Sequence, residues 1–166
     1  MNAEVLILMG SASDAAVMQG ASDILSKLGV RFEMTVASAH RSPARVQRLV
    51  AEAPARGVRV FIVGAGAAAH LAGAVAALTT LPVIGVPVDS SALQGFDALL
   101  STVQMPPGVP VATVSIGKPG ATNAGVLAAQ ILALSDAPLA RRLAAYKKGL
   151  ADAVDAAADT LSDTRE

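Results

Sequence analysis

The sequence predicts an α/β domain in which helices cover both faces of a doubly wound, parallel, five-stranded sheet, followed by a long C-terminal helix. Three observations predict this fold: five short apolar runs alternate with helical patterns, the links between them are short, and 166 residues suit one domain. Such alternation is typical of right-handed βαβ units, whose strands run parallel. We expect one three-layer αβα domain over residues 1–166, with its core at about 4–134 and strand order 2-1-3-4-5.

The five expected strands are short runs rich in Val, Ile and other apolar residues, as buried parallel strands usually are. They cover residues 5–9, 32–36, 60–63, 83–86 and 111–114. Helical patterns are expected at about 15–28, from Pro43 to before Gly57, and at about 71–78, 96–103 and 121–134. Gly29 is the expected stop of the first helix.

The last helix is expected over about 136–162, as an extension of the core. Asp136 can cap it, Pro138 suits its first turn, and apolar residues recur at helical steps from Leu139 to Leu161. Two interpretations stay open for this helix. It packs on its own sheet, or it forms an arm that lies on a neighbouring subunit.

Composition narrows the possible partners. Lys plus Arg and Asp plus Glu number 13 each, without a basic run, so we expect no nucleic acid partner. The stretch 60–88 is apolar, but His70, two threonines and Pro82 interrupt it, so we expect no membrane span. The lack of cysteine and of a positively charged start favours a cytoplasmic protein. With 53% apolar residues and 16% charged ones, some apolar surface should be buried between subunits.

Polar residues gather in the loops that follow the first three expected strands, at 10–14, 38–43 and 64–70. In a doubly wound sheet, ligands bind beyond the carboxyl ends of the strands, where the strand order reverses. Both histidines of the chain lie in these loops. The sequence therefore predicts one site where these three loops meet.

The first loop is typical of phosphate binding. Gly10 lets the backbone approach an anion, and the hydroxyls of Ser11 and Ser13 precede a helix N-terminus. The same residues, and Asp14, are also ordinary helix caps, and both interpretations stay open. In the second loop, Arg41 suits phosphate oxygens, because a guanidinium binds them with two parallel hydrogen bonds, although a surface ion pair is its plain alternative.

His40 is the predicted general acid and base, because imidazole gives and takes protons near neutral pH. His70 heads the third helix and either contacts substrate or caps the turn. Gly66 is expected to let the backbone approach a small ligand, because Gly64-Ala65-Gly66 only partly imitates a dinucleotide fingerprint. The histidines and acids lack metal-ligand spacing, so no metal site is expected.

Several motifs in the same order resemble the N5-carboxyaminoimidazole ribonucleotide mutase family of purine biosynthesis, in its bacterial class. They lie at 9–14, 38–43, 64–71, 87–95, 103–106 and 116–121. The resemblance implies a flavodoxin-like domain that forms a homo-octamer and uses no metal or organic cofactor. It also implies a phosphorylated ribonucleotide as substrate, whose carboxylate moves from the exocyclic nitrogen to carbon 4 of the imidazole.

The resemblance assigns roles residue by residue. It implies that His40 is the general acid and base, that Ser11 and Arg41 bind phosphate, and that Asp14 accepts from ribose hydroxyls. Ser13, Ser38 and His70 would complete the pocket. The chain has Ala67 and Ala72 where the family often has Gly and Pro, and Ala67 would be strained if its position requires a positive φ.

Two alternatives remain at this point. The related carboxylase class adds free carbon dioxide directly to aminoimidazole ribonucleotide, but the motifs at 90–95 and 103–106 resemble the mutase class. A non-catalytic flavodoxin-like nucleotide-binding module is the other. A flavin site favours aromatic stacking, yet the chain has three Phe, one Tyr and no Trp. Gly64 also stands where a receiver domain would have its phosphoacceptor.

Overall fold

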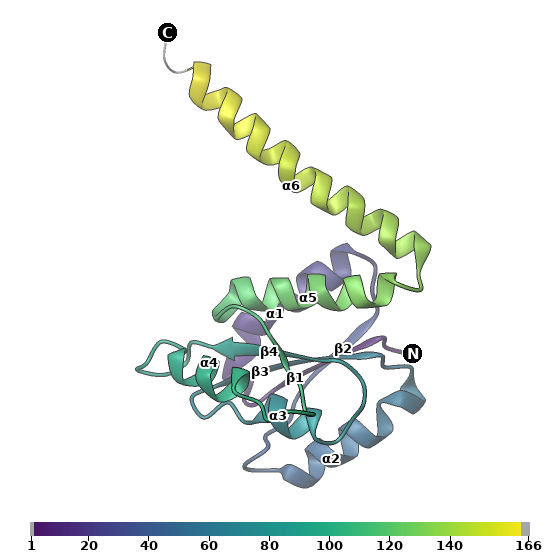
Figure 1. Ribbon diagram of the computed structural model, residues 1–166, viewed down its shortest axis with the longest axis vertical. Helices are drawn as coiled ribbons and strands as arrows, with labels where there is room; N and C mark the ends of the chain where they lie inside the picture. Colours follow the sequence, from purple (N-terminus) through teal and green to yellow (C-terminus); the bar gives the residue numbers. More distant parts are fainter. Residues whose placement is uncertain (1, 164–166) are drawn as a thin grey trace.

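The computed structural model describes residues 2–163 and has the predicted three layers, with a parallel sheet between two layers of helices (Figure 1). The strand order is β2-β1-β3-β4-β5, and every paired strand is parallel. The strands are β1 (Val5–Met9), β2 (Phe32–Val36), β3 (Val60–Gly66), β4 (Val83–Val88) and β5 (Ala112–Thr113). The flavodoxin-like α/β fold predicted from the sequence is therefore confirmed.

Three strands differ in length from the prediction. β3 extends past Val63 to Gly66 because it stays paired with β4 up to the Gly66–Val88 pair, and β4 lengthens with it. The small residues of this segment are typical of a loop, but the ladder between the two strands keeps them extended. β5 is shorter than expected, because this edge strand pairs with β4 only through Ala112 and Thr113.

The helices form two layers. On one side lie α1 (Ala15–Lys27), α5 (Gly117–Ala133) and the start of α6 (Ala137–Asp163), and on the other lie α2 (Pro43–Glu52), α3 (Leu71–Ala76) and α4 (Phe96–Val103) (Figure 1). Short 3₁₀ helices, η1 (Ala12–Asp14) and η2 (Pro54–Arg56), adjoin α1 and α2. Successive β1 residues alternate between two core clusters, so Val5 and Ile7 face α1 and α5 while Leu6 and Leu8 face the opposite layer.

Helix α5 begins at Gly117 and not at 121, as the sequence predicted. Gly117 has φ of 75°, and Pro119 follows in the first helical turn. A Cβ on Gly120 would collide with the carbonyl oxygen of Ser115. The Gly and Pro residues of this segment therefore form a tight helix start, although their composition is typical of a loop.

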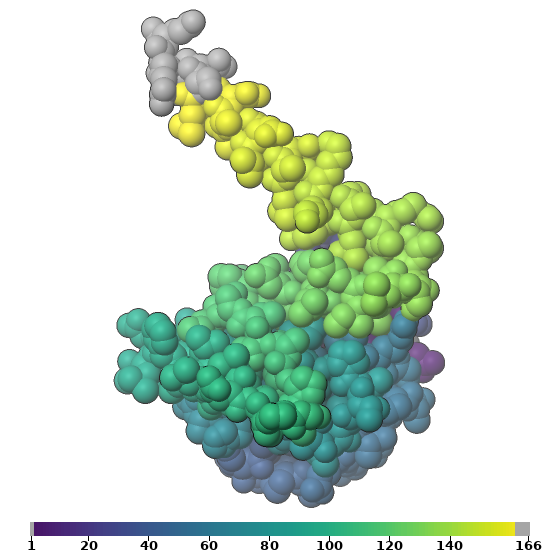
Figure 2. All heavy atoms as spheres, in the orientation of Figure 1, coloured from purple at the N-terminus to yellow at the C-terminus, as the bar shows by residue number. Residues whose placement is uncertain are grey.

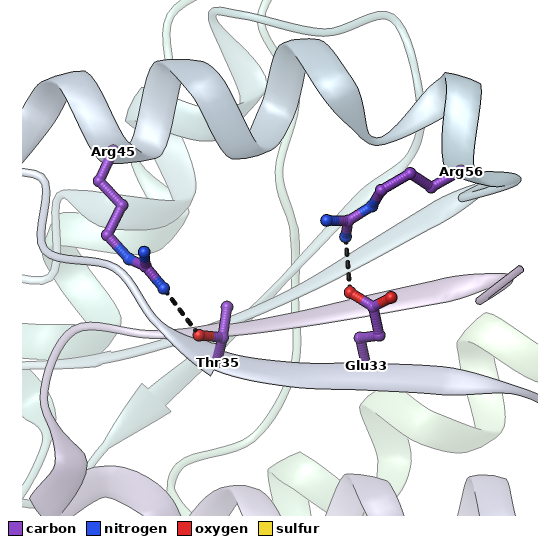
Figure 3. A network of polar contacts seen from close by, with 4 residues as sticks. All are labelled: Glu33, Thr35, Arg45 and Arg56. Carbon is purple, nitrogen blue, oxygen red and sulfur yellow. Dashed lines mark hydrogen bonds and ion pairs between the residues drawn. The ribbon is translucent and has the colours of Figure 1, made fainter. Parts of the chain in front are cut away.

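Two arginines, Arg45 of α2 and Arg56 of η2, hold these helices against the edge strand β2 (Figure 3). Arg45 donates from Nη2 to Thr35 Oγ1 at 3.0 Å and from Nε to the carbonyl of Val36, the last β2 residue, at 2.9 Å. Arg56 pairs with Glu33 at 2.6 Å. Because Arg45 lies in the first turn of α2, these bonds also fix the loop that joins β2 to α2.

Helix α6 packs on the body only through its first part. Asp136 Oδ1 accepts from the Leu139 N–H at 2.9 Å, as its predicted capping role requires, and Leu139 is buried. Arg142 donates to the Leu28 carbonyl at 2.7 Å. Farther along, the helix leaves the body (Figures 1 and 2), and its apolar residues are exposed, namely Leu150, Val154 and Leu161. Within residues 2–163, no helix is both long enough and apolar enough to span a membrane.

Candidate functional site

A cavity of about 320 Å³ opens at the carboxyl ends of β1, β2 and β3. The structure brings all eight residues predicted for the site to its wall: Ser11, Ser13, Asp14, Ser38, His40, Arg41, Gly66 and His70. They come from three loops, and the parallel order β2-β1-β3 places those loops side by side. The position of the site therefore follows from the topology.

Two serine hydroxyls lie together at the start of η1. Ser11 Oγ accepts from Ser13 Oγ at 2.9 Å and, more weakly, from the Ser13 N–H at 3.4 Å. Ser11 also takes part in a capping box with Asp14. Capping and cavity lining therefore occur in the same residues, so the two interpretations of this loop are compatible.

Asp14 is buried, with only 4% of its surface exposed. Its Oδ2 accepts from the Ser11 N–H at 3.0 Å. Burial raises the pKa of Asp14 above its ordinary value of 3.8, because desolvation disfavours the carboxylate. Hydrogen bonds from Ser11 and Ser13 and the charge of Arg41 act in the opposite direction and are weaker. Asp14 is thus a carboxyl group whose ionisation has a cost in the folded state.

Arg41 crosses from the second loop to the first. Its Nη2 donates to the Gly10 carbonyl at 3.0 Å, and its backbone N–H donates to Ser38 Oγ at 3.2 Å. No ion pair involving Arg41 occurs among the side chains of residues 2–161. The surface ion pair, the alternative to phosphate binding, is therefore absent there, and the exposed guanidinium keeps other N–H groups for an anion beside the hydroxyls of Ser11 and Ser13.

The two histidines meet across the cavity. His40 Nε2 lies 2.9 Å from His70 Nδ1, and the rings form an edge-to-face pair with centroids 5.0 Å apart. His70 stands at the N-cap position of α3, but its side chain makes no capping bond. Of the two roles open for His70, contact within the cavity fits this geometry and capping does not.

Small residues at the end of β3 and in the loop after it, at 65–68, form another part of the cavity wall. A Cβ on Gly66 would collide with Ser90 Oγ and crowd Ser90 Cβ and the Val88 carbonyl, so glycine lets β3 and the loop after β4 lie this close. Ser90 also lines the cavity, although it was not among the residues predicted for the site. The motif at 87–95 was the available signal, but it contains two adjacent serines and nothing in the sequence distinguishes them.

Most of the chain matches one known protein family. Residues 4–153 match the model of the family described as AIR carboxylase, and this range contains the whole cavity wall. The chain belongs to the AIR carboxylase family.

Three curated relatives carry the name N5-carboxyaminoimidazole ribonucleotide mutase. The N5-carboxyaminoimidazole ribonucleotide mutase of Bacillus subtilis (strain 168) is 61% identical over 137 residues, which are 82% of this chain and 85% of the relative. The mutase of Brucella melitensis is 51% identical and covers 93% of this chain and 95% of its own length. That of Escherichia coli (strain K12) is also 51% identical, over 92% of this chain and 90% of its own.

Solved structures agree with the fold. The crystal structure of Treponema denticola PurE superposes with a TM-score of 0.86 at 29% identity, and it covers 95% of this chain and 97% of its own. A second structure, of Treponema denticola PurE2-S38D, gives a TM-score of 0.88 at 28% identity, over 97% and 99% of the two chains. The overall fold of this chain is therefore shared with these proteins.

The departure at position 67 has a structural consequence in this chain. Ala67 has φ of 53°, in the left-handed region that favours glycine. It lines the cavity directly after the last β3 residue. The condition for backbone strain at Ala67, a positive φ, is therefore met in this chain.

Proposed function

We propose that this chain is an N5-carboxyaminoimidazole ribonucleotide mutase, an isomerase of purine biosynthesis that forms 4-carboxy-5-aminoimidazole ribonucleotide. The observation that carries the proposal is the 51–61% identity to curated mutases over most of the chain. The cavity supports it, because two histidines, an arginine and two serine hydroxyls face one small space, and imidazole can give and take protons.

The reaction requires one proton to leave the enzyme and one to return. The bond between the exocyclic nitrogen and the carboxylate carbon breaks, the nitrogen takes a proton from His40, and carbon dioxide is released into the cavity. Carbon 4 of the imidazole then attacks carbon dioxide, and the proton of carbon 4 passes to His40. His40 thus ends in its starting state, and no oxidant, reductant or hydrolytic water is needed.

The binding roles follow from the chemistry of the wall. We assign the phosphate to Ser11 and Arg41, because their hydroxyl and guanidinium donors lie on adjacent loops. We assign the ribose hydroxyls to Asp14. Ser13, Ser38 and His70 complete the pocket, and Gly66 allows close approach of the backbone. A small cavity lined by Gly and Ala residues suits the retention of carbon dioxide away from water.

We also propose that the protein functions in the cytoplasm as a homo-octamer of single-domain subunits. Exposed apolar residues support assembly. On and before α4 they are Leu93, Phe96, Leu100 and Val103, and on α6 they are Leu150, Val154 and Leu161. Such surfaces usually mark contacts between subunits. The exposed part of α6 supports the interpretation of this helix as an arm on a neighbouring subunit.

Direct carboxylation of aminoimidazole ribonucleotide remains the second candidate, favoured by the description of the family as AIR carboxylase. One experiment separates the two. Purified protein is given freshly prepared N5-carboxyaminoimidazole ribonucleotide, or aminoimidazole ribonucleotide with bicarbonate, and the carboxylated product is followed in each case. Fast turnover of the first substrate alone supports the mutase. Preference for the second pair would assign the carboxylase, and inactivity on both would refute the two proposals.

A further inference from the structure

Helix α4 contacts the loop between β3 and α3 through two consecutive hydroxyl residues, Ser101 and Thr102. The Ala69 N–H donates to Ser101 Oγ at 3.0 Å, and the Ala69 carbonyl lies 3.5 Å from Thr102 Oγ1. Ala69 and Thr102 are buried, with 1% and 2% of their surfaces exposed. Both polar backbone groups of Ala69 thus face side chains of one helix.

The proton of the Ser101 hydroxyl is directed away from this loop. A serine has one O–H, and the shortest contact available to it is the Asp97 carbonyl in the same helix, at 2.7 Å. The Ala67 carbonyl is farther away, at 3.4 Å. The oxygen of Ser101 therefore presents its lone pairs to the Ala69 N–H, and helix α4 fixes where that N–H lies.

The loop that Ser101 contacts forms one wall of the cavity. Ala67 and Ala68 line it, and His70 follows Ala69 directly in the chain. Within the loop, the His70 N–H donates to the Ala68 carbonyl at 2.8 Å, and Ala67 holds its positive φ. Without Ser101, the buried Ala69 N–H would lose the acceptor recorded for it within residues 2–163. The loop would then move to pair that group with water.

We propose that Ser101 is a positioning residue that holds the loop at 67–70 so that His70 stays against His40. The inference rests on the proposed mutase activity. It separates catalysis from phosphate binding, because Ser11 and Arg41 belong to other loops. Loss of the Ser101 hydroxyl should therefore lower kcat and leave the binding of the phosphorylated nucleotide nearly unchanged.

The test uses full-length protein and three substitutions. Ser101→Thr keeps the hydroxyl. Ser101→Val has nearly the shape of Ser101→Thr but lacks the hydroxyl, and Ser101→Ala removes the hydroxyl with the least bulk. Ser22→Ala is the matched control, because the buried Ser22 hydroxyl also donates to its own helix, at 2.9 Å to the Gln19 carbonyl, but lies on α1 and makes no hydrogen bond to the loop at 67–70 within residues 2–161. The measurements are kcat, the dissociation constant for the nucleotide and the urea midpoint of unfolding.

We expect Ser101→Ala and Ser101→Val to lose roughly tenfold in kcat, because small displacements of catalytic groups are costly. The dissociation constant should change less than about twofold, and Ser101→Thr should stay within about threefold of the parent in kcat. The proposal is overturned if Ser101→Val turns over as fast as Ser101→Thr. It is also overturned if Ser22→Ala loses as much kcat as Ser101→Ala.

Amide hydrogen exchange distinguishes failure of this proposal from failure of the proposed function. The Ala69 amide should exchange at least roughly tenfold faster in Ser101→Val than in Ser101→Thr, whether or not the protein turns over the nucleotide. An inactive parent protein that shows this difference would refute the mutase and retain the loop contact. Equal exchange in the two variants would refute the loop contact.

Discussion

His40 Nε2 and His70 Nδ1 lie 2.9 Å apart, so one ring must donate and the other must accept. Two imidazolium rings would point two N–H groups at each other, and two rings without a proton between them would oppose two lone pairs. A hydrogen bond between the two rings therefore needs one ring N–H between them, and the tautomers decide which ring supplies it. This arrangement suits a residue that must both give and take a proton in one reaction cycle.

The first prediction concerns His40. His40→Asn keeps a polar side chain but removes the titrating group, so we expect kcat to fall by at least about 10²-fold. Binding of the nucleotide should remain, since the phosphate contacts assigned to Ser11 and Arg41 are unchanged. Rapid-mixing kinetics and a binding isotherm measure the two effects. Full activity in this variant would remove His40 from the mechanism.

Arg41→Ala should weaken binding of the phosphorylated nucleotide by about 10- to 100-fold, as a hydrogen bond to a charged group contributes about 1.5–3 kcal/mol. Arg48→Ala is the matched control, because Arg48 is an exposed arginine on α2 that does not line the cavity. Calorimetric titration of both variants gives the comparison. Equal dissociation constants in Arg41→Ala and the parent would exclude Arg41 from phosphate binding.

The fold and the loops of the site could be predicted from the sequence, because apolar runs and short links determine a parallel sheet and its carboxyl edge. Other features depend on contacts between distant segments. Gly64-Ala65-Gly66 is typical of a loop, and only pairing with β4 makes it a strand. Ser90 and Ser101 lie against β3 and the loop after it, and no local pattern distinguishes them from other serines.

Asp14→Asn should alter how stability depends on pH. The folded-state pKa of Asp14 is raised, so between pH 3.8 and that pKa the native protein holds more protons than the unfolded chain. The contribution of Asp14 to stability is therefore full below pH 3.8 and declines as the pH rises through the folded-state pKa. Asn does not titrate. The free energy of unfolding of Asp14→Asn, relative to that of the parent, should therefore increase from pH 3 to pH 7.

Urea unfolding at a series of pH values tests this expectation. Asp23→Asn, at an exposed position of α1, controls for the loss of one carboxyl group. If Asp14→Asn follows the same pH trend as Asp23→Asn, folding does not raise the pKa of Asp14 and the expectation is wrong. The variant should also bind the nucleotide more weakly, because an amide replaces the carboxylate that we assign to the ribose hydroxyls.

Truncation within α6 should break the homo-octamer that we propose. A cut after Leu134 would also remove Leu139, which is buried in the core, so the subunit itself would lose stability. A cut after Gly149 keeps Leu139 and Tyr146 and removes only the exposed part, including Leu150 and Val154. We expect this shorter protein to unfold at nearly the parental urea concentration but to have a smaller mass by light scattering. An unchanged mass would refute the arm.

The last prediction concerns strain at Ala67. A left-handed alanine costs about 1–2 kcal/mol, whereas glycine adopts this conformation freely but loses more entropy on folding, by roughly 0.5–1 kcal/mol. Ala67→Gly should therefore be neutral or stabilising by up to about 1 kcal/mol. Ala68→Gly, in the same loop but at a residue without positive φ, should destabilise by about 0.5–1 kcal/mol. Opposite or unequal shifts in the unfolding midpoint would show the strain, and equal shifts would contradict it. The hydrogen bond from the Ala69 N–H to Ser101 Oγ should still hold the loop before His70 when the strain is removed. The kcat of Ala67→Gly should therefore stay within a few-fold of the parent.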